Sequence, residues 1–284
     1  MRLRIWRVTA ILAAILSGIP AAPAAPARRL LVVCSPGSPG TTVQAQPTMD
    51  AFASAAESAA KWPAGSLGAI YFESAEAGVD RLAAPEAAFA LVPPSFLYEY
   101  GRKLSLEPVL EAKPLAGQGE AYALVAGKGR VTSPASLAGW EITGAPGFSP
   151  SFVREVLLKE WGPLPGDARI TFSAAILGAL RRAATVEKLA VLLDRSQADA
   201  MPTLPFSTKL EVVRVSRTVP AALWCAVGKR VPQADSERLT QALLHLQDQQ
   251  SGKEILTTLR IARFEKVNSA ALADLRMSPS GTKP

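Results

Sequence analysis

Two segments rich in hydroxyl side chains each lie between an apolar run and a helical one. The first is SPGSPGTT at 35–42, and the second is GFSPS at 147–151. Free N–H groups and hydroxyls at the start of a helix stabilise a bound oxyanion. The same residue types also serve as ordinary helix caps, so both interpretations stay open. The candidate ligand-binding hydroxyls are Ser38, Thr41, Thr42, Ser149 and Ser151.

Three further candidates stand just after, or at the end of, predicted buried strands. Ser95 and Tyr98 follow the apolar run 87–92, and Asp194 ends the run 189–193. In open α/β sheets, ligands bind at the carboxyl ends of strands. The alternatives are aromatic packing for Tyr98 and a cap or an ion pair with the neighbouring arginine for Asp194.

The sequence lacks the residue sets that catalysis needs. His245 is the single histidine, and no Ser-His-Asp set can be assembled around it. The segment 147–151 lacks the final glycine of a nucleophile elbow. No glycine-rich phosphate loop with lysine occurs, and no Cys/His/Asp spacing suits a metal. We therefore expect no enzyme, no cofactor and no metal.

The first 27 residues have the three parts of a secretory signal peptide. Arg2, Arg4 and Arg7 precede the apolar run Val8–Ile19, and small residues and prolines continue to Ala27. A membrane-spanning helix needs about 20 apolar residues, more than this run supplies. The sequence predicts cleavage before Arg28 and a periplasmic protein.

The net charge and the cysteine content narrow the class of protein further. The formal net charge is +7, and three of the arginines lie in the predicted signal peptide. No basic cluster is interleaved with aromatics, so we expect no nucleic-acid partner. Cys34 and Cys225 both lie in apolar runs. That placement favours two buried thiols over the disulfide that export would permit.

Short apolar runs alternate with helical stretches, which predicts an α/β fold with mostly parallel strands. The predicted strands begin with Leu30–Cys34, and the rhythm restarts near Ser133. After Lys229 the pattern is helical, with helices expected at 235–249 and 252–259, and the residues from Met277 are expected to be disordered.

From Val131 to Gly162 the order of features resembles bacterial ABC-transporter substrate-binding proteins, in particular the phosphate/phosphite/phosphonate-binding group. Ser133–Gly139 resembles the S-x-x-D-L-x-G pattern of that group. The segments AAFALVPPSFLYEY, AVLLDRSQADAM and the C-terminal helices from Leu239 resemble other parts of it. The sequence departs from the group at Ser173–Ala175, where a histidine is usual, and at Ala87-Ala88, where an acid is expected.

The resemblance implies a two-lobed, type 2 periplasmic-binding-protein fold with crossover strands at Ala121–Ala126 and Ala221–Val227. Lobe 1 would comprise 28–120 plus 228–284, and lobe 2 would comprise 121–227. The implied function is capture of a small anion or zwitterion, phosphonate- or phosphate-like, by a monomer that hands it to an inner-membrane ABC permease. The two departures motivate the alternative of a sensor or interaction module without a transport role.

Overall fold

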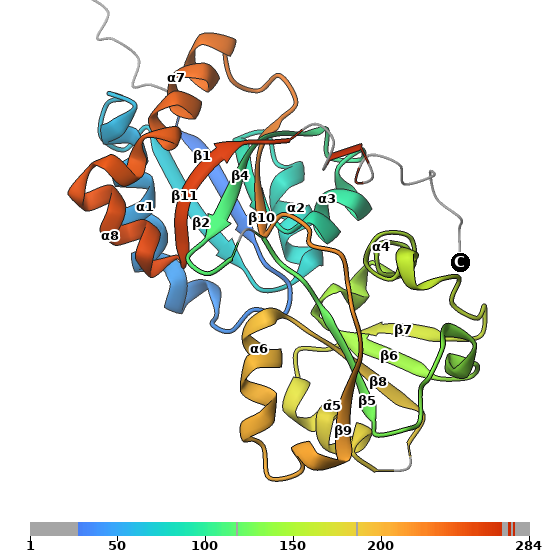
Figure 1. Cartoon of the computed structure of the whole chain (residues 1–284). Coiled ribbons are helices and arrows are strands. Elements are labelled where there is room, and N and C mark those ends of the chain that lie inside the picture. The colour runs from blue at the N-terminus through green and yellow to red at the C-terminus, as the bar shows by residue number, and fades with distance from the viewer. Residues whose placement is uncertain (1–27, 118, 186, 269–271, 274, 276–284) are drawn as a thin grey trace, which may run out of the picture.

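The computed structural model describes residues 28–117, 119–185, 187–268, 272, 273 and 275. The chain forms two α/β lobes, each built on one mixed sheet (Figure 1). We call the part built on the six-stranded sheet lobe one and the part built on the five-stranded sheet lobe two. The predicted signal peptide and the predicted disordered residues from Met277 lie outside the described residues.

Lobe one contains a sheet with the strand order β11-β4-β10-β3-β1-β2. Its strands are β1 Arg29–Cys34, β2 Leu67–Phe72, β3 Ala87–Val92, β4 Leu106–Pro114, β10 Ala222–Val227 and β11 Ile261–Lys266. Its helices are α1 Thr42–Ala59, α2 Ala75–Ala83, α3 Pro94–Tyr100, α7 Gln233–Leu244 and α8 Gln250–Thr258.

Lobe two contains a sheet with the strand order β7-β6-β8-β5-β9. Its strands are β5 Ala123–Gly127, β6 Glu141–Gly144, β7 Arg169–Phe172, β8 Leu189–Leu193 and β9 Leu210–Val215. Its helices are α4 Pro150–Phe152, α5 Ile176–Ala183 and α6 Arg195–Ala200.

The central strands of lobe one are apolar along their length because helices cover both faces of the sheet. One face packs against α1, α7 and α8, where Phe52 and Leu243 meet Trp224 of β10. The other face packs against α2 and α3, where Leu82 and Phe96 are fully buried. The sheet therefore presents only the ends of its strands toward lobe two.

The prediction of mostly parallel strands is correct for part of each sheet. β1 pairs in parallel with β2 and β3, and β6 pairs in parallel with β7 and β8. The pairings of β5 and β10 are antiparallel, because these strands follow segments that pass from one lobe to the other. β10 pairs within the first sheet, although the predicted second lobe ran to residue 227. The division into lobes by residue number stays a prediction.

Three elements differ from the sequence prediction. β11 was missed; it forms because Ile261 and Phe264 are buried while the residues between them face outward. The helix predicted to reach residue 249 ends at Leu244, and a 3₁₀ turn then buries Leu246. The helical run that follows the segment 147–151 is a short α turn followed by a π turn and a 3₁₀ turn.

Both cysteines are buried and unbonded, which confirms the preference for two thiols. Cys225 lies opposite Ala90 of β3, whereas Cys34 lies at the end of β1 beyond that register. The Cys34 thiol donates to the Ser74 carbonyl at 3.3 Å. Within the described residues, no helix is long and apolar enough to cross a membrane.

Candidate functional site

A cavity of about 620 Å³ lies between the two lobes. Lobe one contributes the carboxyl ends of β1, β3 and β4, together with the turn between α8 and β11. Lobe two contributes the junction between β8 and α6. The volume falls within the range of about 300–1,000 Å³ that is usual for small-molecule sites.

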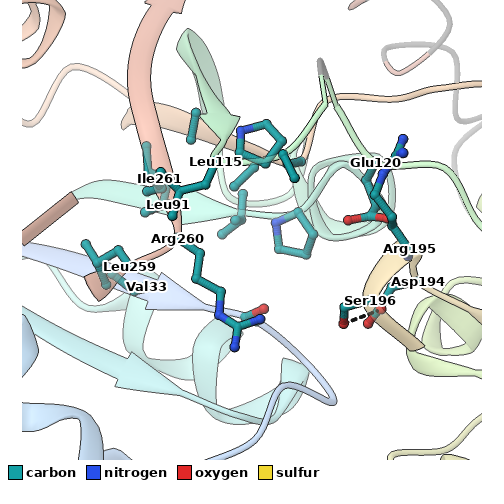
Figure 2. A pocket seen from close by; sticks show the side chains of 18 of the residues that line it. Val33, Leu91, Leu115, Glu120, Asp194, Arg195, Ser196, Leu259, Arg260 and Ile261 are labelled. Carbon is teal, nitrogen blue, oxygen red and sulfur yellow. Dashed lines mark hydrogen bonds between the residues drawn. The ribbon is translucent and has the colours of Figure 1, made fainter. Parts of the chain in front are cut away.

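One side of this cavity is apolar. Figure 2 shows these side chains gathered on the lobe-one side, around the ends of the strands. The branched apolar side chains are those of Val33, Leu91, Val92, Leu115, Leu259 and Ile261. Cys34 also lines the cavity, and burial raises the pKa of its thiol to about 12, so that it stays neutral.

Most of the charged groups of the cavity lie on its other side (Figure 2). They are the carboxylates of Glu120, Asp194 and Asp199 and the guanidinium of Arg195, whereas the Arg260 guanidinium comes from the lobe-one turn between α8 and β11. Burial raises the pKa of Glu120, and the neighbouring charge of Asp194 raises it further. The backbone N–H of Arg195 donates to Glu120 Oε1 at 2.9 Å and partly offsets this effect.

Asp194 has a structural role as well as a place on the cavity wall. It is the N-cap of α6, where its Oδ1 accepts from the Gln197 backbone at 2.8 Å. The same oxygen accepts from the Ser196 hydroxyl at 2.9 Å. The side chain of Gln197 completes a capping box with the Asp194 backbone. This geometry fixes the Asp194 carboxylate at the mouth of lobe two.

The predicted hydroxyls of the first loop are engaged within lobe one. Ser38 shares a hydrogen bond of 2.7 Å with Ser35, which itself lines the cavity. Thr41 is the N-cap of α1 and forms a capping box with Gln44. Thr42 donates to Glu73 at 3.4 Å. The cap interpretation thus accounts for Thr41, and none of the three predicted residues lines the cavity.

The predicted hydroxyls of the second loop, Ser149 and Ser151, also lie outside the cavity. Ser149 is fully buried, and its hydroxyl donates to Glu99 Oε2 in lobe one at 2.7 Å. Ser151 is exposed. A glycine is required at position 147 because its backbone packs closely against the backbone of β7. A Cβ at this position would lie 1.9 Å from the Thr171 carbonyl oxygen.

Tyr98 also joins the two lobes. Its hydroxyl donates to Glu155 Oε2 at 2.7 Å, and its ring packs edge-on against Phe152 with centroids 5.7 Å apart. Burial, together with the bond to Glu155, raises the pKa of Tyr98, so the phenol remains a donor. Ser95, on the same helix, is buried.

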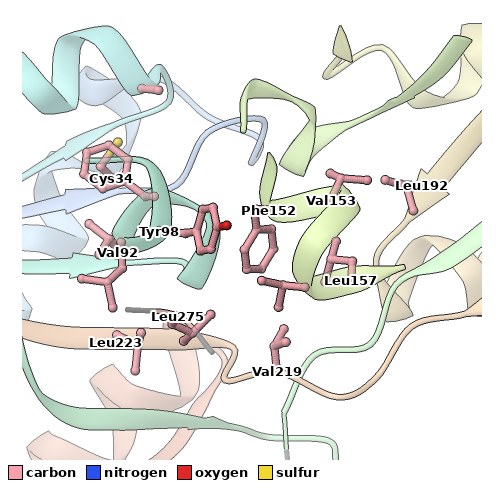
Figure 3. Close-up of a cluster of buried hydrophobic side chains, with 14 of the residues drawn as sticks. Cys34, Val92, Tyr98, Phe152, Val153, Leu157, Leu192, Val219, Leu223 and Leu275 are labelled. Atoms are coloured by element: carbon pink, nitrogen blue, oxygen red, sulfur yellow. The ribbon is translucent and has the colours of Figure 1, made fainter. Parts of the chain in front are cut away.

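The contact around Tyr98 belongs to one apolar cluster that spans both lobes (Figure 3). Figure 3 shows Tyr98 and Phe152 next to each other, with Val92 and Leu223 on the lobe-one side and Leu157 and Leu192 on the lobe-two side. Val219, from the returning crossover segment, packs in the same cluster. The lobes are therefore closed against each other on the α3–α4 side, and the cavity lies on the other side.

Of the eight predicted site residues, only Asp194 lines the cavity. Sequence reasoning missed Glu120, Arg260 and the apolar wall. Glu120 stands just before the predicted crossover strand, a position with no hydroxyl or glycine signature. Arg260 lies in a region predicted to be purely helical, so its turn could not be anticipated.

Comparison with known proteins places this geometry in a family. The family described as ABC transporter, phosphonate, periplasmic substrate-binding protein matches residues 69–272, which is most of the chain. The chain belongs to this phosphonate-binding family. The resemblance inferred from the sequence is thereby confirmed, and no curated protein matches the chain.

Solved structures share the fold of this chain at low sequence identity. XAC2383 from Xanthomonas citri, bound to ATP, has a TM-score of 0.67 and 13% identity, covering 88% of this chain and 94% of its own. A binding protein component of an ABC phosphonate transporter from Pseudomonas aeruginosa has a TM-score of 0.60 and 12% identity, covering 86% and 83%. PhnD1 from Prochlorococcus marinus, in complex with methylphosphonate, has a TM-score of 0.58 and 15% identity, covering 87% and 96%.

Membership settles the general role. Proteins of the phosphonate-binding family are periplasmic substrate-binding components of ABC transporters, and the two-lobed type 2 fold is the one predicted. The family is one of transport proteins. Within the described residues, no group of three or more His, Cys, Asp or Glu side chains is placed to hold a metal ion.

Proposed function

We propose that this protein binds a small anionic or zwitterionic solute between its lobes and hands it to an inner-membrane ABC permease. In this proposal the chain is exported, cleaved before Arg28, and works as a monomer without catalysis. The observation that carries the proposal is the cavity of about 620 Å³ whose charged groups come mainly from lobe two and whose apolar wall comes from lobe one.

A cavity shared by two lobes couples ligand binding to closure. A ligand that contacts Ser35 on one side and Asp194 on the other would bind the closed form better than an open one. That difference in affinity is the energy available for closing. A permease can then distinguish the loaded protein from the empty one by its shape.

Phosphonates are the first ligands to test. The description of the family names phosphonate, and the structure of PhnD1 contains methylphosphonate. Arg195 and Arg260 supply positive charge for an acidic group. The three carboxylates of the same cavity favour a ligand that also carries a positive group.

Thermal-shift and calorimetric screening of the mature protein tests this proposal. The panel comprises phosphate, methylphosphonate, aminoethylphosphonate, an alkanesulfonate and short carboxylic acids. A ligand at one hundred times its Kd stabilises the folded state by about 2.7 kcal/mol. Absence of stabilisation by every compound would contradict the proposal. Stimulation of the ATPase of a reconstituted permease would then establish the partner.

The contacts on the α3–α4 side favour a second candidate, a sensor module. Ser149 donates to Glu99 and Tyr98 donates to Glu155, so protein groups alone join the lobes there. A sensor would present this closed form to a membrane partner without a transported solute. Recovery of a membrane kinase and no permease in a pull-down, with no ligand found in the screen, would favour this candidate.

A further inference from the structure

We propose that the end of lobe two farthest from the cavity is a docking surface for anionic phospholipid headgroups at a membrane. We call this surface the basic tip. It consists of six exposed cations, Lys128, Arg169, Arg181, Arg182, Lys188 and Lys209. None of them lines the cavity, so this inference does not depend on which solute the cavity takes.

The topology of the second sheet brings these cations to one end of lobe two. The parallel strands β6, β7 and β8 begin at this end, whereas the antiparallel strand β5 ends there and β9 begins there. Figure 1 shows this end of β5 and β9 pointing away from lobe one. β8 runs over about 13 Å from Leu189 at the basic tip to Leu193 beside the cavity. The basic tip and the cavity thus lie at opposite ends of the same sheet.

Backbone hydrogen bonds hold the turns of the basic tip together. The Lys128 N–H donates to the Lys209 carbonyl at 2.9 Å, so the turn after β5 lies against the turn before β9. The Glu141 N–H donates to the Lys188 carbonyl at 3.0 Å and joins the start of β6 to the start of β8. All of these bonds lie within lobe two. The arrangement of the cations is therefore the same whether the lobes are open or closed.

Most cations of the basic tip are free of ion pairs. Lys128, Lys188 and Lys209 form no ion pair with any residue in the described part of the chain. Arg182 pairs with Glu187 at 2.8 Å, but both side chains are half-exposed, and such a pair contributes little stability. The ammonium groups are therefore available to an external anion.

The carboxylates at this end of the sheet do not cancel the positive charge. Glu141 is half-buried and accepts from the Thr171 hydroxyl at 2.7 Å. Glu211 is half-buried and accepts from the backbone of the turn after β5 at 2.7 Å. Asp167 and Glu187 are exposed. The surface that faces water thus carries six cations and two carboxylates, and it attracts anions.

A layer of lipid headgroups fits the basic tip better than a folded protein does. Protein interfaces are built around a buried apolar core. None of the exposed large apolar side chains in the described part of the chain lies in the turns of the basic tip. Lysine carries its charge on a flexible stem, so each ammonium group can follow a mobile phosphate. The family is periplasmic, and the periplasm is bounded by phospholipid membranes.

The expected attachment is reversible and sensitive to salt. Each Lys or Arg close to an anionic membrane strengthens binding about fivefold. The attraction acts over a Debye length, which is about 8 Å at physiological ionic strength. Attachment through the basic tip keeps the protein at the membrane surface while the cavity, at the other end of the sheet, stays open to solutes.

Vesicle co-sedimentation of the mature protein tests this inference. One set of vesicles contains phosphatidylcholine with one third phosphatidylglycerol, and the other contains phosphatidylcholine alone. We expect binding to the anionic vesicles at low salt, no binding to the neutral vesicles, and weaker binding as the salt concentration rises.

Two double variants assign the binding to the basic tip. Lys128→Gln with Lys209→Gln should bind the anionic vesicles about 25-fold more weakly than the parent protein. The matched control is Lys229→Gln with Lys253→Gln, because these lysines are exposed on lobe one and the change in net charge is the same. The control should bind like the parent. Circular dichroism verifies that both variants are folded, and the Kd of any solute should be the same in both.

Three results would overturn this inference. Anionic vesicles that stay bare at low salt would do so, and this is also the result expected if the basic tip served an acidic protein surface. Equal weakening in the two double variants would assign the binding to net charge instead of the basic tip. Equal binding to neutral vesicles would assign it to apolar contacts. Solute binding is measured separately, so each of these results leaves the proposed function standing.

Discussion

The Ser149 hydroxyl donates a hydrogen bond of 2.7 Å to the Glu99 carboxylate across the boundary between the lobes. Ser149 is fully buried, so this oxygen has no exchange with solvent in the closed form. The loop that the sequence predicted to hold an anion thus holds a carboxylate of the protein itself. Closure on this side of the molecule therefore needs no ligand.

Removing this hydrogen bond should favour the open form. Ser149→Ala loses a bond to a charged acceptor, which is worth about 1.5–3 kcal/mol. We expect a larger radius of gyration in small-angle X-ray scattering and a lower melting temperature for the ligand-free protein. The matched control is Ser151→Ala, since Ser151 is exposed two residues away. Equal scattering from both variants would show that the bond does not hold the lobes.

Tyr98 offers a second test of the same closure. Tyr98→Phe keeps the ring against Phe152 but removes the hydroxyl that donates to Glu155. We expect a loss of about 1–2 kcal/mol in the free energy of unfolding by urea, because the acceptor is a carboxylate. Tyr100→Phe is the control, since the ring of Tyr100 stacks on Phe148 and its hydroxyl takes no part in the Tyr98 contact. A similar loss in both variants would contradict the specific role of Tyr98.

Sequence periodicity sufficed for most strands because their burial is local. β3 and β8 are apolar throughout, β1 is apolar after Arg29, and the length and flanking turns of these strands separate them from helices. β11 was missed because only two of its six residues are buried and it pairs with a strand far away in sequence. The direction of β10 depends on the return of the chain between lobes, which no local pattern encodes.

The candidate site was harder to predict for a similar reason. The hydroxyls of Thr41 and Ser149 stand where an anion site would begin, but whether each binds a ligand or a protein group depends on distant partners. In the folded protein, the Thr41 hydroxyl accepts from the Gln44 backbone, and the Ser149 hydroxyl donates to Glu99. The cavity is assembled from at least six separate segments, and only Asp194 carried a local signal of its position.

The Thr41 side chain should contribute stability and not affinity. Thr41→Ala removes the capping box of α1 and should cost about 1 kcal/mol in the free energy of unfolding. Thr41→Ser keeps the hydroxyl and should recover most of that loss. The Kd of any ligand found in the screen should be the same for both variants. A Kd that rises in Thr41→Ala and recovers in Thr41→Ser would place Thr41 in the binding site.

The two cysteines should be unreactive in the folded protein. Burial raises the pKa of Cys34 to about 12 and also raises that of Cys225, and the thiolate is the reactive form. We expect no labelling by a thiol reagent at pH 8 in buffer and labelling of both thiols in urea, measured by mass spectrometry. A reductant should leave the melting temperature unchanged. A mass that shows one bond between the cysteines would contradict this expectation.

The last prediction concerns the pH dependence of stability at Glu120. Burial raises the folded-state pKa of Glu120 above its unfolded value, so the folded state prefers the protonated acid. This stabilising contribution is complete below the unfolded pKa and is lost as the pH rises through the folded pKa. At neutral pH the protein therefore bears the cost of a buried carboxylate.

Glu120→Gln removes that cost, and we expect the variant to be more stable than the parent protein at pH 7. The difference should shrink on acidification and vanish below about pH 4, where the parent side chain is also neutral. Urea unfolding of both proteins between pH 4 and 8 measures it. Glu107→Gln makes the same substitution at an exposed position of β4, and its effect on stability should not depend on pH in this way. Higher stability together with weaker binding of an ammonium ligand would mark Glu120 as a residue kept for recognition at the expense of stability.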